Sequence, residues 1–300
     1  MKEIRLGTRQ SKLAIAQANM VKELIESKSR NVSVKIIPMK TSGDVVSDVR
    51  RAGLDKSAFT NDLELALLDN RIDMAVHSMK DLPSGLPEGL YVAGTPERGD
   101  ARDVLVTHKG CKLQDLPSGS KIGTSSLRRK YQLLKLRYDI EVVEIHGNVD
   151  TRIRKVRDKQ LDGVVVAACG LQRLGLESQI SQFFSVDEMI PAACQGILAI
   201  EVRRNDEFAS NIAYETNHAA TYEAAKYERS FLEEVGGDCN KVVAAHASVA
   251  ENRISFLGLL GLPDGKYFIR DKAESAEDGI ALAKKVAANL LSRIQHLDLG

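Results

Sequence analysis

Apolar residues in the first 205 positions form short runs that alternate with stretches of helical spacing. The runs predict strands at 4–7, 32–39, 72–76, 90–94, 104–107, 121–123, 140–145, 162–168 and 197–202. The clearest helical spacing extends from Leu13 to Ile25, with Ser11 as the expected N-cap. Strands that alternate with helices imply an α/β fold with parallel sheets and right-handed crossovers.

The pattern changes after Thr221. The later elements are predicted to be a helix at 222–235, strands at 242–249, 254–260 and 267–269, and a helix from about 277 to 294. They indicate a small α+β domain at the end of the chain. Earlier, the charged and turn-rich segment 96–103 predicts a crossing between two domains, and 44–58 predicts a mobile loop. Asn61–Glu64 resembles a capping box that opens a helix at 63–68.

Size and composition limit the classes of protein that the chain could belong to. Three hundred residues predict two or three domains. The 42 basic and 41 acidic residues leave a net charge of +1, which argues against a dedicated nucleic-acid or membrane-surface protein. No apolar stretch is long enough to cross a membrane, and the N-terminal residues lack a signal-peptide core. We therefore expect a cytoplasmic protein.

The four cysteines, Cys111, Cys169, Cys194 and Cys239, are widely scattered and show no C-x-x-C spacing. Neither a zinc site nor a redox motif is expected, and free thiols fit a cytosolic protein. The chain also lacks a P-loop, a G-x-G-x-x-G fingerprint and a G-x-S-x-G elbow, so neither nucleotide binding nor serine hydrolysis is supported.

One predicted strand ends in side chains that could carry chemistry. The apolar run 72–76 is followed by His77 and Ser78, then by Lys80 and Asp81. Ligands of open α/β sheets bind just beyond the carboxyl ends of strands, so this lysine and carboxylate are candidates for charge chemistry. Taken alone, the segment favours a strand-end turn whose charges are simply solvated.

Other predicted strand ends also carry cationic or hydroxyl groups. The five segments are Arg9–Ser11, Lys80, Ser125–Arg129, His146–Arg152 and Arg173. Each alone is weak evidence, because surface arginines are usually solvated. Together, at the ends of two sheets, they predict a cation-lined cleft that suits a polycarboxylate or a polyphosphate. Asp81 is the one acid among these bases, and its expected partner is a positive charge on the substrate or an intermediate.

Arg128 and Arg129 occupy the first turn of a predicted helix, where positive charge opposes the helix dipole. A bound anion would offset this cost, with the nearby Thr and Ser hydroxyls as further donors. No contact with the core is implied by the sequence. We therefore expect an Arg129→Leu variant to fold normally and to lose only ligand binding.

Several of these segments, in order and across essentially the whole chain, resemble the porphobilinogen deaminase (hydroxymethylbilane synthase) family. The matching stretches are Thr8–Ser11, Val76–Pro83, Gly123–Arg129, Gly147–Asn148, Thr151–Arg152, Gly170–Gly175 and Gln195–Gly196. The resemblance implies α/β architecture with two domains like type II periplasmic-binding proteins, whose sheets are mixed and mainly parallel, and a small α+β C-terminal domain. The implied domains are 1–96 with 197–216, 97–196 and 217–300.

The resemblance also implies an activity and a cofactor. Four porphobilinogen molecules would be condensed head to tail, with release of ammonia, on a covalent dipyrromethane, and hydrolysis would then free hydroxymethylbilane. The pathway would be tetrapyrrole and heme biosynthesis, in a monomer that passes its product to uroporphyrinogen-III synthase. Cys239 matches the cysteine that bears the cofactor through a thioether.

Site roles follow from the same resemblance. Asp81 would be catalytic, stabilising the cation left when ammonia departs and helping to move pyrrole protons. Cofactor-binding positions would be Ser11, Lys80, Asp81, Ser126, Arg128, Arg129, Gly147 and Cys239. Substrate-binding positions would be Arg9, His146, Arg152, Arg173 and Gln195. No metal is expected.

The chain departs from the family pattern at three places. The family usually has arginine where this chain has His146. Because histidine loses its charge as the pH rises and arginine does not, we predict that substrate binding weakens more on the alkaline side than at an arginine-bearing site. The family's Gly-Gly-Cys loop, with proline three residues after the cysteine, here contains Asp238 before Cys239 and Val242 after it. The segment Lys56–Asp62 has one lysine fewer than the family's Lys-Gly-x-Phe-x-Lys-Glu.

Two other functions compete with the enzyme. A non-catalytic anion receptor on the same two-domain fold would need neither Cys239 nor Asp81. DNA binding by the basic segment 128–137 is the less well supported alternative, because the net charge is near zero and no recognition motif is present.

Overall fold

The computed structural model describes residues 2–41, 57–83, 85–236, 242–250, 253–262, 265 and 267–298. The chain divides into two compact units. The first is Met1–Gly99 with Gly196–Tyr222, and the second is Asp100–Gln195 with Glu223–Gly300. The three domain boundaries expected from the sequence stay a prediction.

The first unit is built on a five-stranded sheet in the order β2-β1-β3-β10-β4. Its strands are β1 (Lys2–Arg9), β2 (Val32–Met39), β3 (Met74–Ser78), β4 (Leu90–Gly94) and β10 (Leu198–Arg203). β1 pairs in parallel with β2 and β3, whereas β10 runs antiparallel to both β3 and β4. Four strands therefore point one way and β10 points the other.

Helices cover the two faces of this sheet. They are α1 (Lys12–Lys28), α3 (Ser57–Leu68) and α7 (Glu207–Glu215). Residues of α1 and α7 pack with Ile4, Leu6 and Ile200 in one apolar core. α3 contributes Leu63 and Leu67 to a second core with Ala75. Residues at alternate positions along β3 thus face different cores, as strand geometry requires.

The start of α3 corrects one sequence expectation. The predicted capping box at Asn61–Glu64 lies inside the helix, which begins at Ser57. Thr60, Leu63, Glu64 and Leu67 are all buried at helical spacing, so the buried face begins before the polar Asn61 and Asp62. The expected mobile loop at 44–58 falls mainly on residues outside the described ranges.

The second unit contains a five-stranded sheet in the order β7-β6-β8-β5-β9. Its strands are β5 (Asp103–Thr107), β6 (Lys121–Gly123), β7 (Glu141–Val143), β8 (Gly163–Ala167) and β9 (Gln182–Phe183). β6 pairs in parallel with β7 and β8, and β5 runs antiparallel to β8 and β9. In each of the two sheets the reversed strand is the one that follows a crossing between the units.

Three helices of this unit begin near the carboxyl ends of its parallel strands. They are α4 (Leu127–Leu136), α5 (Val149–Arg157) and α6 (Ala168–Arg173). β8 is buried along its whole length, which explains its continuous apolar sequence.

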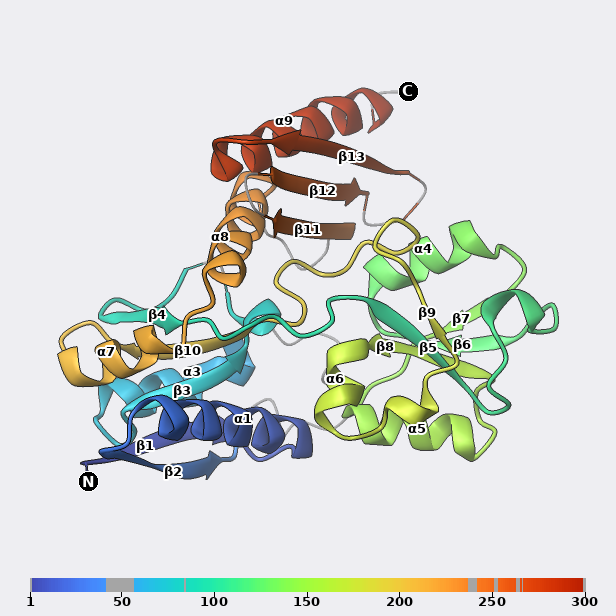
Figure 1. The fold of residues 1–300 in the computed structure, drawn as a ribbon. Coiled ribbons are helices and arrows are strands. Elements are labelled where there is room, and N and C mark those ends of the chain that lie inside the picture. Colours follow the sequence, from blue (N-terminus) through green and yellow to red (C-terminus); the bar gives the residue numbers. More distant parts are fainter. Residues whose placement is uncertain are drawn as a thin grey trace. The chain divides into compact units, whose positions relative to one another are not determined.

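The C-terminal residues of the second unit form an antiparallel sheet, β11-β12-β13, with two long helices (Figure 1). These elements are α8 (Ala219–Glu234), β11 (Val242–Ala250), β12 (Arg253–Gly261), β13 (Phe268–Ser275) and α9 (Gly279–Asp298). Phe231 of α8 and Phe256 of β12 centre the core, with ring centroids 5.4 Å apart.

The predicted fold class is confirmed: an α/β chain with two mixed, mainly parallel sheets and a small α+β part at the end. The short strand β9 and the helix α7 were not predicted. No helix among the described residues has the length and apolarity that a membrane span requires.

Candidate functional site

The carboxyl edge of the first sheet brings together the candidates Arg9, Ser11, Lys80 and Asp81. β1 ends at Arg9 and runs parallel to β3, with Gly7 level with Ala75. Ser11 caps α1, since its hydroxyl accepts a hydrogen bond from the Ala14 amide at 3.2 Å. The predicted N-cap is therefore confirmed.

Lys80 and Asp81 lie in a single 3-10 turn, Met79–Asp81, directly after β3. The Met79 amide donates to the Ile197 carbonyl at 3.0 Å, which anchors the start of this turn to the chain before β10. Both charged side chains are half-buried. Among the described residues the Asp81 carboxylate has no hydrogen-bond or ion-pair partner, so it is available to a ligand.

The carboxyl edge of the second sheet gathers the remaining described candidates. β6 leads to Ser126 and the start of α4, β7 leads to His146 and Gly147, and β8 leads to α6, which ends at Arg173. Ser126 is the N-cap of α4 and accepts from the Arg129 amide at 3.4 Å. The predicted gathering of these groups at strand ends is confirmed within each unit.

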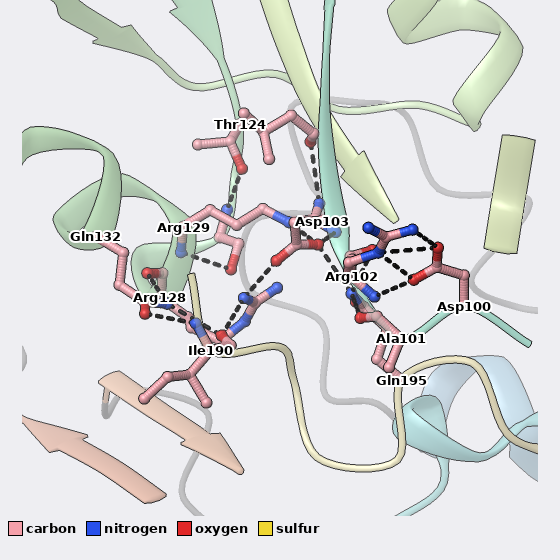
Figure 2. Close-up of polar contacts among 12 residues, drawn as sticks. Asp100, Ala101, Arg102, Asp103, Thr124, Arg128, Arg129, Gln132, Ile190 and Gln195 are labelled. Carbon is pink, nitrogen blue, oxygen red and sulfur yellow. Dashed lines mark hydrogen bonds and ion pairs between the residues drawn. The ribbon is translucent and has the colours of Figure 1, made fainter. Parts of the chain in front are cut away.

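Arg128 and Arg129 converge on the carboxylate of Asp103, the first residue of β5 (Figure 2). Arg128 Nη1 donates to Asp103 Oδ2 at 2.6 Å, and Arg129 donates to Oδ1 from Nη2 at 2.7 Å and from Nε at 3.1 Å. Gln195 Nε2 adds a fourth hydrogen bond to this carboxylate, at 2.9 Å from Oδ1. We call these four residues the Asp103 node.

The charges of the Asp103 node are almost entirely removed from water. The side chain of Asp103 is 0% exposed, and those of Arg128 and Arg129 are 7% and 8% exposed. Burial alone raises the pKa of Asp103, but the charges and hydrogen bonds of both guanidinium groups outweigh it and hold the pKa far below its ordinary value. Asp103 is therefore ionised at neutral pH, and the three charged groups sum to +1.

The protein uses only part of the donor capacity of the two arginines. Arg128 Nη1 also donates to the Ile190 carbonyl at 2.7 Å, and Arg129 Nη1 donates to the Val165 carbonyl at 3.1 Å. Each guanidinium has five N–H donors. Within the described part of the chain, Nε and Nη2 of Arg128 make no hydrogen bond, and Arg129 keeps one N–H on each of Nη1 and Nη2. These donors fit a further carboxylate.

This geometry corrects the expectation that only a bound anion explains an arginine pair at a helix start. Asp103 supplies the counter-charge from within the chain. The expectation that Arg129 has no core contact is also wrong, because its side chain is buried between Asp103 and the Val165 carbonyl. The proposed binding of the cofactor by these arginines is a separate matter and stays a prediction.

His146, Gly147 and Arg152 surround the turn between β7 and α5. His146 Nε2 lies 3.1 Å from a carboxylate oxygen of Glu144, so it already has an acidic neighbour. Gly147 has φ of +107°, a conformation that favours glycine, and its carbonyl accepts from Arg152 Nε at 2.8 Å. This hydrogen bond ties the Arg152 guanidinium to the turn.

Gln195 and Arg173 occupy less accessible positions than the sequence suggested. Gln195 is completely buried, and its amide nitrogen donates to the Ala101 carbonyl at 2.8 Å as well as to Asp103. It therefore helps to hold the Asp103 carboxylate in place. Burial lowers the pKa of Arg173 from its ordinary value. The substrate-binding roles of both residues stay predictions.

Asp103 is the functional residue that the sequence reasoning missed. It was placed in the charged crossing segment 96–103 and given no role. A signal was present: a carboxylate opens the apolar strand Val104–Val106, where a buried acid requires a cationic partner. Cys239 lies outside the described residues. Among the residues that are described, no group of His, Cys, Asp and Glu could hold a metal ion.

The fold and the Asp103 node define an α/β protein with a charge-compensated arginine pair at the ends of parallel strands. Residues 4–211 match a family model described as "Porphobilinogen deaminase, dipyromethane cofactor binding domain", and residues 222–292 match the family's C-terminal domain. The chain belongs to the porphobilinogen deaminase family. Its activity is that of a hydroxymethylbilane synthase with a dipyrromethane cofactor, in tetrapyrrole biosynthesis.

Curated relatives match along nearly their whole length. The porphobilinogen deaminase of Syntrophomonas wolfei is 45% identical over 267 residues, covering 89% of this chain and 87% of the relative. That of Carboxydothermus hydrogenoformans is 41% identical over 291 residues, covering 95% and 94%. Family membership favours the enzyme over the receptor and the DNA-binding alternatives.

Solved structures similar to this chain include two ligand-binding proteins. The methionine-binding protein MetQ has a TM-score of 0.45 at 13% identity, covering 75% of this chain and 94% of MetQ. The periplasmic aliphatic sulphonate-binding protein SsuA from Escherichia coli has a TM-score of 0.40 at 13% identity, covering 80% and 72%.

Replacing Asp103 by Asn is expected to lower the free energy of unfolding by about 3–5 kcal/mol at pH 7, because two buried guanidinium groups lose their counter-charge. The pKa of Asp103 is depressed in the folded protein, so its contribution is present above the unfolded value near ~3.9 and is lost as the pH falls through the folded value. Urea unfolding should therefore show that the difference in free energy of unfolding between wild type and Asp103→Asn becomes smaller below about pH 4. The exposed Asp115→Asn is the control, expected within about 0.5 kcal/mol. An Asp103→Asn variant as stable as this control would contradict the stabilising role of the Asp103 node.

Proposed function

We propose that the unused donors of Arg128 and Arg129 bind carboxylate groups of the dipyrromethane cofactor and of the growing pyrrole chain. The observation that carries this proposal is the Asp103 node. Its internal carboxylate holds both guanidinium groups in place before any ligand arrives, and the node retains a charge of +1. Preorganised guanidinium groups suit carboxylates, because the donors are planar and lose little freedom on binding.

The remaining cofactor contacts are assigned to groups at the same sheet edges. At the edge of the first sheet, Lys80 offers an ammonium and Ser11 offers a hydroxyl. At the edge of the second sheet, Ser126 offers a hydroxyl and Gly147 offers backbone groups. When bound, the cofactor supplies the pyrrole carbon to which the first substrate is joined. We assign its thioether attachment to Cys239, which matches the family's cysteine.

Substrate carboxylates are assigned to Arg9, Arg152, Arg173 and His146. Porphobilinogen carries an acetate and a propionate arm, so each condensation adds two carboxylates that need cationic partners. Gln195 acts on the substrate through the Asp103 node, because its side chain is buried and bonded to Asp103. Glu144 lies beside His146 and competes with substrate carboxylates for it.

Asp81 is the proposed catalytic residue. Its carboxylate is half-buried and has no partner among the described residues, in contrast to Asp103. A negative charge at this place stabilises the positive charge that develops on the substrate as ammonia leaves, and it accepts a proton in the following step. This contrast supports a structural role for Asp103 and a chemical role for Asp81.

We further propose that the protein acts as a cytoplasmic monomer. The scattered cysteines and the near-zero net charge support this location. By the same family resemblance, we propose that the linear product passes to uroporphyrinogen-III synthase.

The cofactor attachment can be tested by intact-mass measurement. The wild-type protein, purified from cells that make porphobilinogen, should exceed its sequence mass by one dipyrromethane. Cys239→Ser should lack this adduct, because serine provides no thiolate to form the thioether. Replacing Cys111, Cys169 or Cys194 should preserve it. Unmodified wild-type protein from such cells would contradict the assignment.

Asp81→Asn removes the charge and keeps the shape of the side chain. Turnover should fall by at least ~10²-fold, because the developing positive charge loses its electrostatic partner. The rate of hydroxymethylbilane formation at saturating porphobilinogen measures the effect. The exposed Asp69→Asn of the same unit serves as the control and should keep normal turnover. Turnover of Asp81→Asn within a few-fold of wild type would remove Asp81 from the chemistry.

A further inference from the structure

A buried histidine–carboxylate pair lies immediately before the turn that carries Lys80 and Asp81. His77 of β3 and Glu201 of β10 approach to 2.9 Å between Nε2 and Oε2, and their side chains are 4% and 0% exposed. Their strands are antiparallel, with His77 opposite Ala199 and Ala75 opposite Glu201. The pair therefore joins the last residues of β3 diagonally to its neighbouring strand.

A second carboxylate approaches this pair from α3. Glu64 is 4% exposed and lies on α3, which packs against both β3 and β10. Thr60, one helical turn earlier, is 2% exposed. Glu64 Oε1, Glu201 Oε1 and Thr60 Oγ1 are three of the five buried side-chain atoms in the described residues that lack a hydrogen-bond partner. Orphan oxygens are thus concentrated at this one place.

The other charged groups around Glu64 are already paired. On β10, Arg203 donates to the carbonyls of Leu67 and Ile72 and to Asp206. β1 presents Gly7 to α3, and Arg5, two residues earlier on that strand, binds Asp73. From β4, Leu90 packs in the apolar core. His77 is therefore the basic side chain that lies beside these carboxylates, 2.9 Å from Glu201.

Two ionised carboxylates beside one imidazole would leave buried negative charge and unsatisfied oxygens, an arrangement of high energy. A proton on one carboxylate reduces this negative charge by one and turns one orphan acceptor into a donor. Burial raises the pKa of Glu64 above its ordinary value, and the charge of Glu201 adds to this; the nearby Thr60 hydroxyl and His77 act in the opposite direction. A metal ion is not an alternative, because no group of such residues in the described ranges could hold one.

We propose that Glu64 is the protonated member of a buried Glu64–Glu201–His77 cluster, and that this cluster positions the end of β3 from which Lys80 and Asp81 project. The proposal rests on the catalytic role assigned to Asp81. The cluster binds α3, β3 and β10 to one another at the level of His77, two residues before the turn begins at Met79. These three side chains are positioning residues, since they act through the backbone that presents Lys80 and Asp81.

The protonation of Glu64 has a direct spectroscopic test. Infrared spectra of the wild-type protein at pH 7 should contain the band of a buried protonated carboxylic acid, and Glu64→Gln should lack it. Gln resembles the protonated acid in shape, so Glu64→Gln should keep its kcat within about twofold of wild type. Exposed Glu3→Gln should keep the band. Absence of the band from the wild type would overturn the proposal.

Stability against pH gives an independent readout. A raised pKa in the folded state means that the folded protein binds more protons than the unfolded chain, so stability falls as the pH rises above the unfolded value near ~4.3. Glu64→Gln removes this loss. The urea midpoint of Glu64→Gln minus that of wild type should therefore increase progressively from pH ~5 to ~8. A constant difference across this range would show that Glu64 is not protonated.

The positioning role is tested by Glu201→Gln, which leaves His77 without its anion. We expect kcat to fall about tenfold through misplacement of the turn, with KM within about twofold and a normal cofactor adduct by mass. An unchanged kcat would refute positioning. If Asp81→Asn proved fully active while the infrared and pH results held, the role of Asp81 would fail and the protonated cluster would stand.

Discussion

The burial of one carboxylate, Asp103, constrains the whole carboxyl edge of the second sheet. An ionised acid at 0% exposure is tolerated only where cations and donors surround it, and here Arg128, Arg129 and Gln195 do so. These partners come from the start of α4 and from the segment before β10. Their hydrogen bonds to Val165 and Ile190 extend the constraint to β8 and to the chain after β9.

This constraint explains how cationic groups can be held ready for a polyanionic ligand. Two unpaired guanidinium groups in a buried place would repel each other and lose their hydration. One internal carboxylate removes half of the charge, fixes the planes of both groups and leaves part of their donors unused. The first unit uses a different arrangement, because Asp81 remains partly exposed and unpaired among the described residues while the neighbouring Glu201 is buried beside His77.

Local sequence patterns predicted most elements of the fold, since apolar periodicity is set by burial along each strand and helix. The strand-end positions of Lys80, Ser126 and Arg128 were predictable for the same reason. The Asp103 node was not, because it joins residues 25 or more positions apart, and no local pattern encodes such pairing. The early start of α3 was missed because the buried Thr60 and Glu64 are polar, so they do not appear in an apolar pattern. The acidic neighbour of His146, Glu144 at 3.1 Å, was not predicted either, because no pattern in the segment indicates that these two side chains meet.

The central claim is that Asp103 organises the arginine pair before the cofactor is present. The most direct measurement is the hydrogen exchange of the Arg129 Nε–H, followed by NMR in cofactor-free Cys239→Ser protein. Slow exchange is expected there, because Nε donates to the buried Asp103 carboxylate at 3.1 Å with no ligand required. Exchange as fast as that of the exposed Arg154, slowing only when the cofactor is loaded, would contradict the claim.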